Sequence, residues 1–255
     1  YDLCRHLVTS ILLPMKTRPR TPVTPSPFLD GNKVEEMAAA MGEPATRSAQ
    51  QQLKENCLER DNFQCMLTGI TDISAPKHGR SIVGYSGRTI PSHIIPFSLG
   101  CWDNNEENQE IARIWTTLRR CFPCLMLQPK HINNSANLMT LSQEAHSSFG
   151  AFELAFDPTG EPNEYEIFTF PGYPTILDLH MPQPNMYGKR IIKFTSYSDA
   201  ELPSSVVLQI HATLSKILHA SGMGKHIDDV MRERDRIRGL SSDGSTDISR
   251  LLFAF

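Results

Sequence analysis

Three polar residues in a fixed order constrain this chain more than any other feature of its sequence: His93, Asn137 and His146. His93 lies in a short run rich in branched residues, 89–97, which Pro96 brings to an end. Asn137 stands in a polar loop, and the stretch after it continues as a helix that carries His146. A strand, a loop and a helix that each present one of these side chains predict an α+β fold in which the three lie close together.

The phrases around these residues are long and keep their order along the chain. They are C-M-L-T-G at 65–69, S-H-I-I-P-F-S-L at 92–99, I-N-N-S-A-N-L-M-T-L at 132–141 and H-S-S-F-G-A-F-E-L-A-F-D-P at 146–158. Together with the helical tail at 211–228, they resemble the fungal branch of the HNH endonuclease superfamily. The resemblance extends from about Cys57 to the last residue, and it implies an HNH-type ββα-metal module between Cys57 and His146.

The resemblance also implies roles for individual residues. His93 matches the family's general base, which takes a proton from water, and Asn137 matches the catalytic-site Asn that holds the strand of that base. His146 matches the metal-binding residue of the helix, so Mg²⁺ or Mn²⁺ is the implied cofactor. One of Asn133, Asn134 and Asn137 is expected to supply a further ligand, and Asn133 is the candidate chosen. Active members usually have Asp before the base as a metal ligand, whereas this chain has Ser92, whose neutral hydroxyl is a weak ligand for Mg²⁺.

Apolar residues follow the candidate base and indicate a pocket. Phe97 and Trp102, together with Ser92, are the residues that we expect to contact substrate. Such a pocket supports a second interpretation, in which the HNH scaffold serves fungal specialised metabolism without a metal cofactor. His93 would then act as acid, base or hydrogen-bond donor in the cyclisation of a polyketide or terpenoid intermediate. A non-catalytic binding or regulatory protein is a third interpretation.

The cysteine pattern and the hydropathy bear on compartment and metal content. Six cysteines are too few and too irregularly spaced for a disulfide framework in 255 residues, which indicates an intracellular compartment, cytoplasmic or nuclear. Cys121 and Cys124 form one Cys-x-x-Cys pair without a second pair, which argues against structural zinc. No apolar run of 18 residues occurs, so no membrane-spanning segment is expected.

The charge distribution limits the partners. Residues 55–170 contain eight basic and 14 acidic residues, whereas the whole chain has a net charge of −3. Proteins that bind nucleic acid tightly draw most of their affinity from Lys and Arg on phosphates, so this balance disfavours tight binding. The expected partner is nucleic acid or a small hydrophobic molecule, and the sequence does not indicate an oligomeric state.

Three segments are expected along the chain. Residues 1–54 combine an N-terminal helix with a proline-rich linker at 16–31, and the apolar run at 7–15 is interpreted as a truncated helix rather than a signal peptide. Residues 55–170 hold the HNH-like module with an insertion, and 171–255 hold a strand and helices that pack on it. The pattern predicts helices at 32–60 (broken at 42–44), 104–121, 204–222, 226–238 and 247–253, and strands at 63–69, 89–97, 152–156, 165–170 and 190–194.

Overall fold

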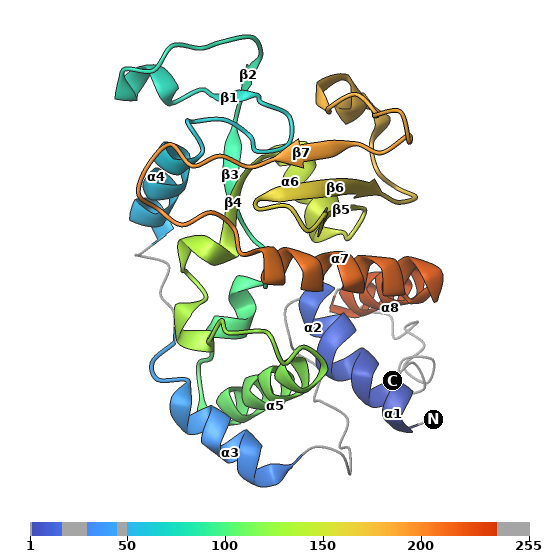
Figure 1. The fold of residues 1–255 in the computed structure, drawn as a ribbon. Coiled ribbons are helices and arrows are strands. Elements are labelled where there is room, and N and C mark those ends of the chain that lie inside the picture. Colours follow the sequence, from blue (N-terminus) through green and yellow to red (C-terminus); the bar gives the residue numbers. More distant parts are fainter. Residues whose placement is uncertain (1, 17–29, 45–49, 239–255) are drawn as a thin grey trace. The chain divides into compact units, whose positions relative to one another are not determined.

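The structure is a computed structural model that describes residues 2–16, 30–44 and 50–238 (Figure 1). The chain divides into two compact units, residues 1–215 and 216–255, and each is described by itself. Most of the predicted proline-rich linker and the whole predicted helix at 247–253 lie outside the described residues. The boundaries predicted near residues 54 and 170 stay predictions.

The N-terminal helix is continuous but changes its pitch. It consists of α1 (Asp2–Leu7), one stretch of π-helix (η1, Val8–Leu12) and α2 (Leu13–Lys16). The backbone N–H of Leu13 donates to the carbonyl of Val8, five residues back. Pro14 follows directly, and because proline has no N–H, a wider turn before it disturbs fewer helical hydrogen bonds.

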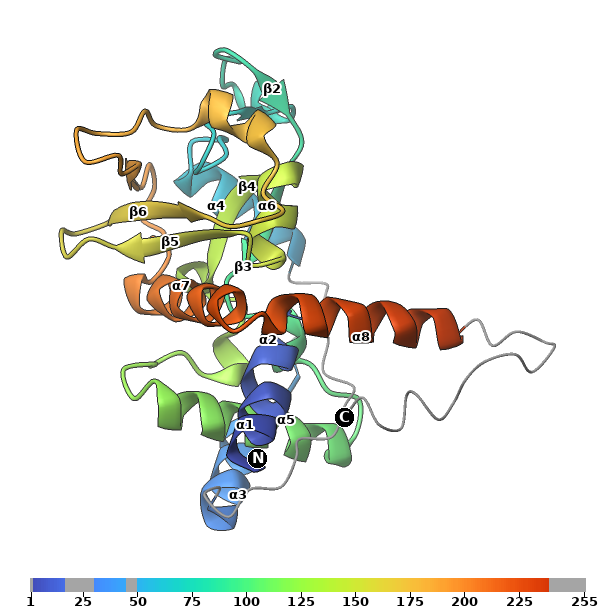
Figure 2. The same cartoon turned by 90° about the vertical axis from the view of Figure 1, so that its right-hand side faces the viewer.

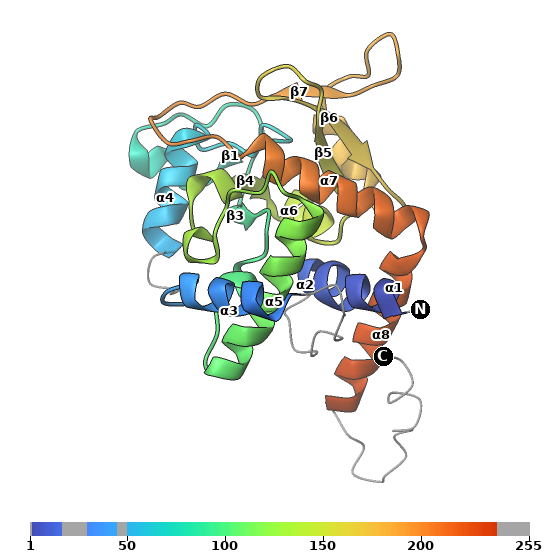
Figure 3. The same cartoon turned by 60° about the horizontal axis from the view of Figure 1, so that its bottom comes forward.

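Helices α3 (Gly31–Ala40) and α5 (Asn105–Cys121) pack on each other, and α5 also packs on the N-terminal helix (Figure 3). Both begin with side-chain caps, since Asp30 accepts a hydrogen bond from the backbone N–H of Asn32 and Asn104 accepts one from that of Glu107. The α5 face that is apolar in the sequence is buried, as its helical spacing predicts; its residues are Ile111, Ile114, Trp115 and Leu118.

The predicted α+β fold of the module is present as two strands and a helix (Figure 1). β3 (Thr89–His93) pairs antiparallel with β4 (Leu138–Ser142), and α6 (Gln143–Gly150) follows β4 directly and packs on both strands. The prediction of a loop after Asn137 is therefore wrong, because β4 occupies those residues. All five residues of β4 are buried, so the polar alternation that marks a half-exposed strand is absent from its sequence.

The prediction of a strand at 63–69 is also wrong. Only Gln64 makes an isolated bridge, to Thr71. Asn62 and Phe63 have φ values of 53° and 57°, a left-handed backbone that ends helix α4 (Gln50–Arg60) and turns the chain before a strand can extend. Two very short strands lie nearby, β1 (Thr71–Asp72) and β2 (Ser86–Gly87), and they pair in parallel.

A three-stranded antiparallel sheet contains the strands predicted at 152–156, 165–170 and 190–194 (Figure 1; its first two strands are also labelled in Figure 2). Its strands are β5 (Leu154–Pro158), β6 (Glu164–Thr169) and β7 (Ile191–Lys193). Five short 3₁₀ turns connect the described elements: η3 (Ala75–His78), η4 (Phe97–Gly100), η5 (Pro129–His131), η6 (Ser135–Asn137) and η7 (Thr175–His180).

Two helices end the described chain, α7 (Ser205–Ala220) and α8 (Met223–Arg238). The part of α7 that belongs to the first unit buries apolar residues at helical spacing, among them Val207, Ile210 and Leu214. In the second unit, Gly222 has a φ of 70° between the two helices, a conformation that glycine adopts without strain. Among the described helices, none has the length and apolar character needed to cross a membrane.

A buried ion pair completes the outer edge of β4. The guanidinium of Arg60 donates to both carboxylate oxygens of Asp61, at 2.6 and 2.8 Å, and neither side chain is exposed. Arg60 also donates to the carbonyl of Leu138, at 2.9 Å, while Asp61 accepts from the N–H of Thr140, at 3.0 Å. These two side chains thus make hydrogen bonds to the β4 backbone along the edge at which a third strand would otherwise pair.

The Arg60 guanidinium ties distant parts of the chain together as well. Its Nη1 donates to the carbonyls of Ser135 and Glu201, at 2.9 Å each. The turn that precedes β4 and the segment that precedes α7 are therefore fixed by the same side chain. Because these carbonyls and the Asp61 carboxylate lie around one buried group, they all lose a donor if that group is removed.

Replacing Arg60 by Met should lower the free energy of unfolding by about 3–5 kcal/mol, because it leaves a buried carboxylate without its counter-ion. Urea unfolding followed by circular dichroism measures this loss. The matched control is Arg80→Met, since Arg80 is exposed and should cost less than about 0.5 kcal/mol. Equal stability of the two variants would contradict a structural role for the buried pair.

Candidate active site

The strand β3 brings His93 to the edge of a cavity. Side chains alternate along a strand, so Pro91 and His93 share one face, and both line this cavity. In the ladder, Pro91 is opposite Thr140. The N–H of Thr140 donates to Asp61 and its carbonyl accepts from the N–H of Met66, both on the side of β4 that faces away from β3. The pair is thus not hydrogen-bonded across the ladder, and the missing N–H of Pro91 costs no ladder bond.

Asn137 fixes the segment that follows His93. It is fully buried, and its Oδ1 accepts from the N–H of Ile95 at 2.8 Å. Its Nδ2 donates to the carbonyls of Ile95 and Ile132, at 3.0 and 2.9 Å, and its own carbonyl accepts from the N–H of Ile94 at 2.9 Å. With its amide committed to backbone groups, Asn137 positions the strand end that carries His93.

Asn133 orients the ring of His93. The Nε2 of His93 lies 3.0 Å from the Oδ1 of Asn133. An amide oxygen only accepts hydrogen bonds, so in the neutral ring the proton resides on Nε2 and Nδ1 carries a lone pair. That Nδ1 has no hydrogen-bond partner within the described part of the chain, and it is therefore able to accept a proton.

The predicted helix ligand, His146, is held by the residue that replaces the usual Asp. The Oγ of Ser92 and the Nδ1 of His146 share a hydrogen bond of 2.8 Å. Ser92 is almost fully buried, with 1% of its surface exposed. The two expected metal ligands, Asn133 and His146, thus contact different partners, the first His93 and the second Ser92.

Both histidines line a cavity of about 310 Å³. Phe97 lies against His93, with 5.4 Å between the ring centroids, and also lines the cavity. Trp102, the other aromatic residue expected to contact substrate, is half-buried and does not line it. The lining is mostly apolar: Met15, Lys16, Pro91, His93, Ile94, Pro96, Phe97, Ser98, His146, Phe149, Gly150, Phe152 and His211.

Burial keeps the histidines of the cavity neutral. The pKa of His93 is lowered mainly by burial and further by the nearby imidazole of His146, while the hydrogen bond to Asn133 opposes the shift. Burial alone lowers the pKa of His146. The effect of the His146 imidazole on His93 indicates that the two rings lie near each other. At neutral pH both rings are uncharged.

The donor set does not fit Mg²⁺. Hard cations such as Mg²⁺ are held through carboxylate oxygens, and no Asp or Glu lines this cavity. Over residues 2–16, 30–44 and 50–238, no group of three His, Cys, Asp or Glu side chains is arranged to hold a metal ion. The residues expected as metal ligands offer an imidazole already bonded to Ser92 and an amide already bonded to His93.

Two lining residues were not recognised as site residues from the sequence. Lys16 ends the N-terminal helix and contributes an ammonium group to the lining. His211, on α7, is buried and also lines the cavity. Both residues lie far from His93 in sequence, and only the packing of α2 and α7 brings them to it.

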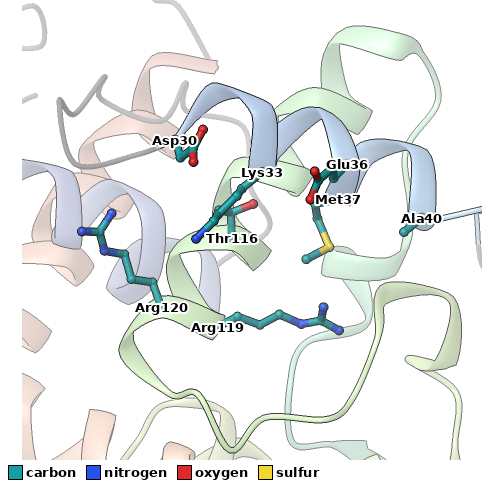
Figure 4. Close-up of a pocket in the computed structure, with 8 residues that line it drawn as sticks. All are labelled: Asp30, Lys33, Glu36, Met37, Ala40, Thr116, Arg119 and Arg120. Carbon is teal, nitrogen blue, oxygen red and sulfur yellow. The ribbon is translucent and has the colours of Figure 1, made fainter.

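A second cavity, of about 710 Å³, lies between α3 and α5 (Figure 4). Basic residues line it beside acidic ones, and the side chains of Arg119 and Arg120 point apart. The two guanidinium groups therefore do not form one clamp for an anion. None of the site residues predicted from the sequence lines this cavity.

The buried His211 should make the protein sensitive to acid. Burial lowers its pKa from 6.5 to about 3, against the opposing effect of a hydrogen bond to the Phe149 carbonyl. Between these values the unfolded state binds the extra proton, so stability falls as the pH falls, by about 1.4 kcal/mol per pH unit. From pH 7 to pH 5, wild type should lose about 2 kcal/mol more unfolding free energy than His211→Phe, measured by urea titration. Equal losses would mean that the folded protein accommodates a charged His211.

A comparison with known proteins agrees with this arrangement. Residues 65–157 match the family model described as HNH endonuclease, a span that contains β3, β4, α6 and every predicted site residue. The match covers less than half of the 255-residue chain. No curated protein and no solved structure matches the chain. The segment 65–157, with His93 on its strand and His146 on its helix, is therefore similar to HNH endonucleases.

Proposed function

We propose that this protein hydrolyses phosphodiester bonds of nucleic acid with His93 as the general base. The observation that carries the proposal is the state of the His93 ring inside an HNH-type strand and helix. Its Nε2 proton is committed to Asn133, which leaves the lone pair on Nδ1, and the residue lines the cavity. The lowered pKa keeps that lone pair available at neutral pH, as a base requires.

In the proposed reaction, Nδ1 of His93 takes a proton from water as the water oxygen attacks phosphorus. The bond from phosphorus to the leaving oxygen breaks, and that oxygen takes a proton from solvent. Lys16 is a cation in the lining and would attract the phosphate. Asn137 and Asn133 hold the base in place, and no step is assigned to a metal ion because the donor set does not fit Mg²⁺.

HNH endonucleases generally use a divalent cation, which makes Mg²⁺ or Mn²⁺ the cofactor to test, but the donors present do not fit Mg²⁺ because Ser92 stands where a carboxylate ligand is expected. The acidic balance of residues 55–170 favours weak, transient contact with nucleic acid over tight binding. We also propose an intracellular site of action, cytoplasmic or nuclear, which the sparse, irregular cysteines support.

Removing the base should remove the reaction. His93→Ala should reduce the rate of nicking of a supercoiled plasmid by about 10²- to 10⁴-fold, the usual contribution of a positioned general base. His226→Ala is the control, because His226 is exposed on α8, and it should keep the wild-type rate. Full activity of His93→Ala, or a variant that no longer folds by circular dichroism, would show that His93 is structural.

A carboxylate at position 92 should restore the missing cation ligand. Ser92→Asp should tighten Mn²⁺ binding roughly tenfold or more, equivalent to about 1.4 kcal/mol, and should raise the cleavage rate. Isothermal titration with Mn²⁺ and the plasmid assay measure the two effects. The matched control is Ser92→Asn, because Asn has nearly the shape of Asp without its charge. It should neither tighten Mn²⁺ binding nor raise the cleavage rate. If Ser92→Asp and Ser92→Asn behave alike, cation binding does not limit this site.

A second candidate function is a cyclisation in fungal specialised metabolism, with a hydrophobic polyketide or terpenoid intermediate as substrate. The observation that favours it is a largely apolar cavity without carboxylates beside a neutral, oriented histidine. His93 would then transfer a proton or donate a hydrogen bond while the cavity walls fold the substrate. Plasmid nicking that depends on His93 would favour the nuclease over this alternative.

A further inference from the structure

His211 is built into the wall of the cavity in an unusual way. Its imidazole lies between the rings of Phe149 and Phe152, with centroid distances of 3.8 and 4.4 Å and an angle of 9° to each. Both aromatic neighbours also line the cavity. Because two nearly parallel rings at these distances cover the two faces of the imidazole, only its edge is left to meet the cavity.

One of the two nitrogens on that edge has a partner and the other has none. The Nε2 of His211 donates to the carbonyl of Phe149 at 3.1 Å, which fixes the proton on Nε2. The Nδ1 is buried and makes no hydrogen bond to the described residues. A buried acceptor without a donor is destabilising, and native structures rarely leave one in that state.

Acid does not readily resolve this mismatch. Burial lowers the pKa of His211 to about 3, so the ring stays neutral at physiological pH and Nδ1 stays an acceptor. Such a nitrogen bonds an O–H or N–H group and has no attraction for an anion. His211 itself lines the cavity, so the cavity is a space from which such a group could come.

We propose that this cavity is a binding pocket for a neutral, apolar ring compound with one O–H or N–H group, which donates its hydrogen bond to Nδ1 of His211. The apolar body would lie against Phe97, Ile94 and Pro96, and the far end would reach His93. A volume of about 310 Å³ is at the lower end of small-molecule sites and suits a compound of one or two rings. The pocket shares His93 with the proposed reactions, but binding is measured without any reaction.

The probes are 2-naphthol and 2-methylnaphthalene, which have similar shapes and differ in the single donor. Binding to the full chain is measured by isothermal titration or by probe fluorescence. The wild type should bind 2-naphthol about tenfold tighter than 2-methylnaphthalene, the effect of one buried hydrogen bond. In His211→Phe, which keeps an aromatic ring in the stack, this preference should disappear. His226→Phe is the matched control and should keep it.

Several outcomes overturn the proposal: no binding of 2-naphthol, equal binding of both probes by the wild type, or an unchanged preference in His211→Phe. If that variant does not fold, nitrogen-15 NMR of wild-type histidines replaces it. The Nδ1 resonance of His211 should then shift with 2-naphthol and not with 2-methylnaphthalene, and the absence of a shift overturns the proposal. Plasmid nicking is assayed separately. Failure to nick plasmid would therefore not contradict the binding proposal, and failure to bind 2-naphthol would not contradict the nuclease proposal.

Discussion

The rest of the site depends on the buried pair of Arg60 and Asp61, because this pair completes a strand that has only one neighbour. β4 pairs with β3 on one side, and on the other side its backbone bonds to these two side chains. A buried ion pair contributes little net stability, since the loss of hydration offsets the attraction. Its value here is geometric: it fixes the register of β4, and β4 begins directly after Asn137, the residue that holds the segment behind His93.

The site combines HNH-type placement with a different set of donors. His93 on a strand, Asn137 before β4 and His146 on a helix all lie in the segment that matches the HNH endonuclease model, and Asn133 orients the ring of His93. The position before the base holds a hydroxyl that bonds His146, where a carboxylate would be free to bind a cation. The scaffold therefore supports acid–base chemistry more directly than it supports binding of a hard cation.

Burial gives the cavity its chemical character. It lowers the pKa of His93, His146 and His211, so that three imidazoles line the space without adding charge to it. Each ring has one nitrogen bonded to the protein, namely to Asn133, Ser92 or the Phe149 carbonyl. The remaining nitrogen is Nδ1 in both His93 and His211. We propose proton transfer for that of His93 and recognition of a donor group for that of His211.

The sequence by itself determined the local elements and the identity of the module. Helical spacing predicted α5 and α7, the strand pattern at 152–156 and 165–170 predicted β5 and β6, and the ordered phrases indicated the HNH-like segment. These signals depend only on neighbours along the chain. β4 was missed because a strand buried on both faces has no alternation. Only the tertiary structure decided that Asn133 orients His93, that Ser92 bonds His146, and that Lys16 and His211 join them. Those contacts connect residues up to about 200 positions apart, and they form only where packing removes water and leaves each polar group one possible partner.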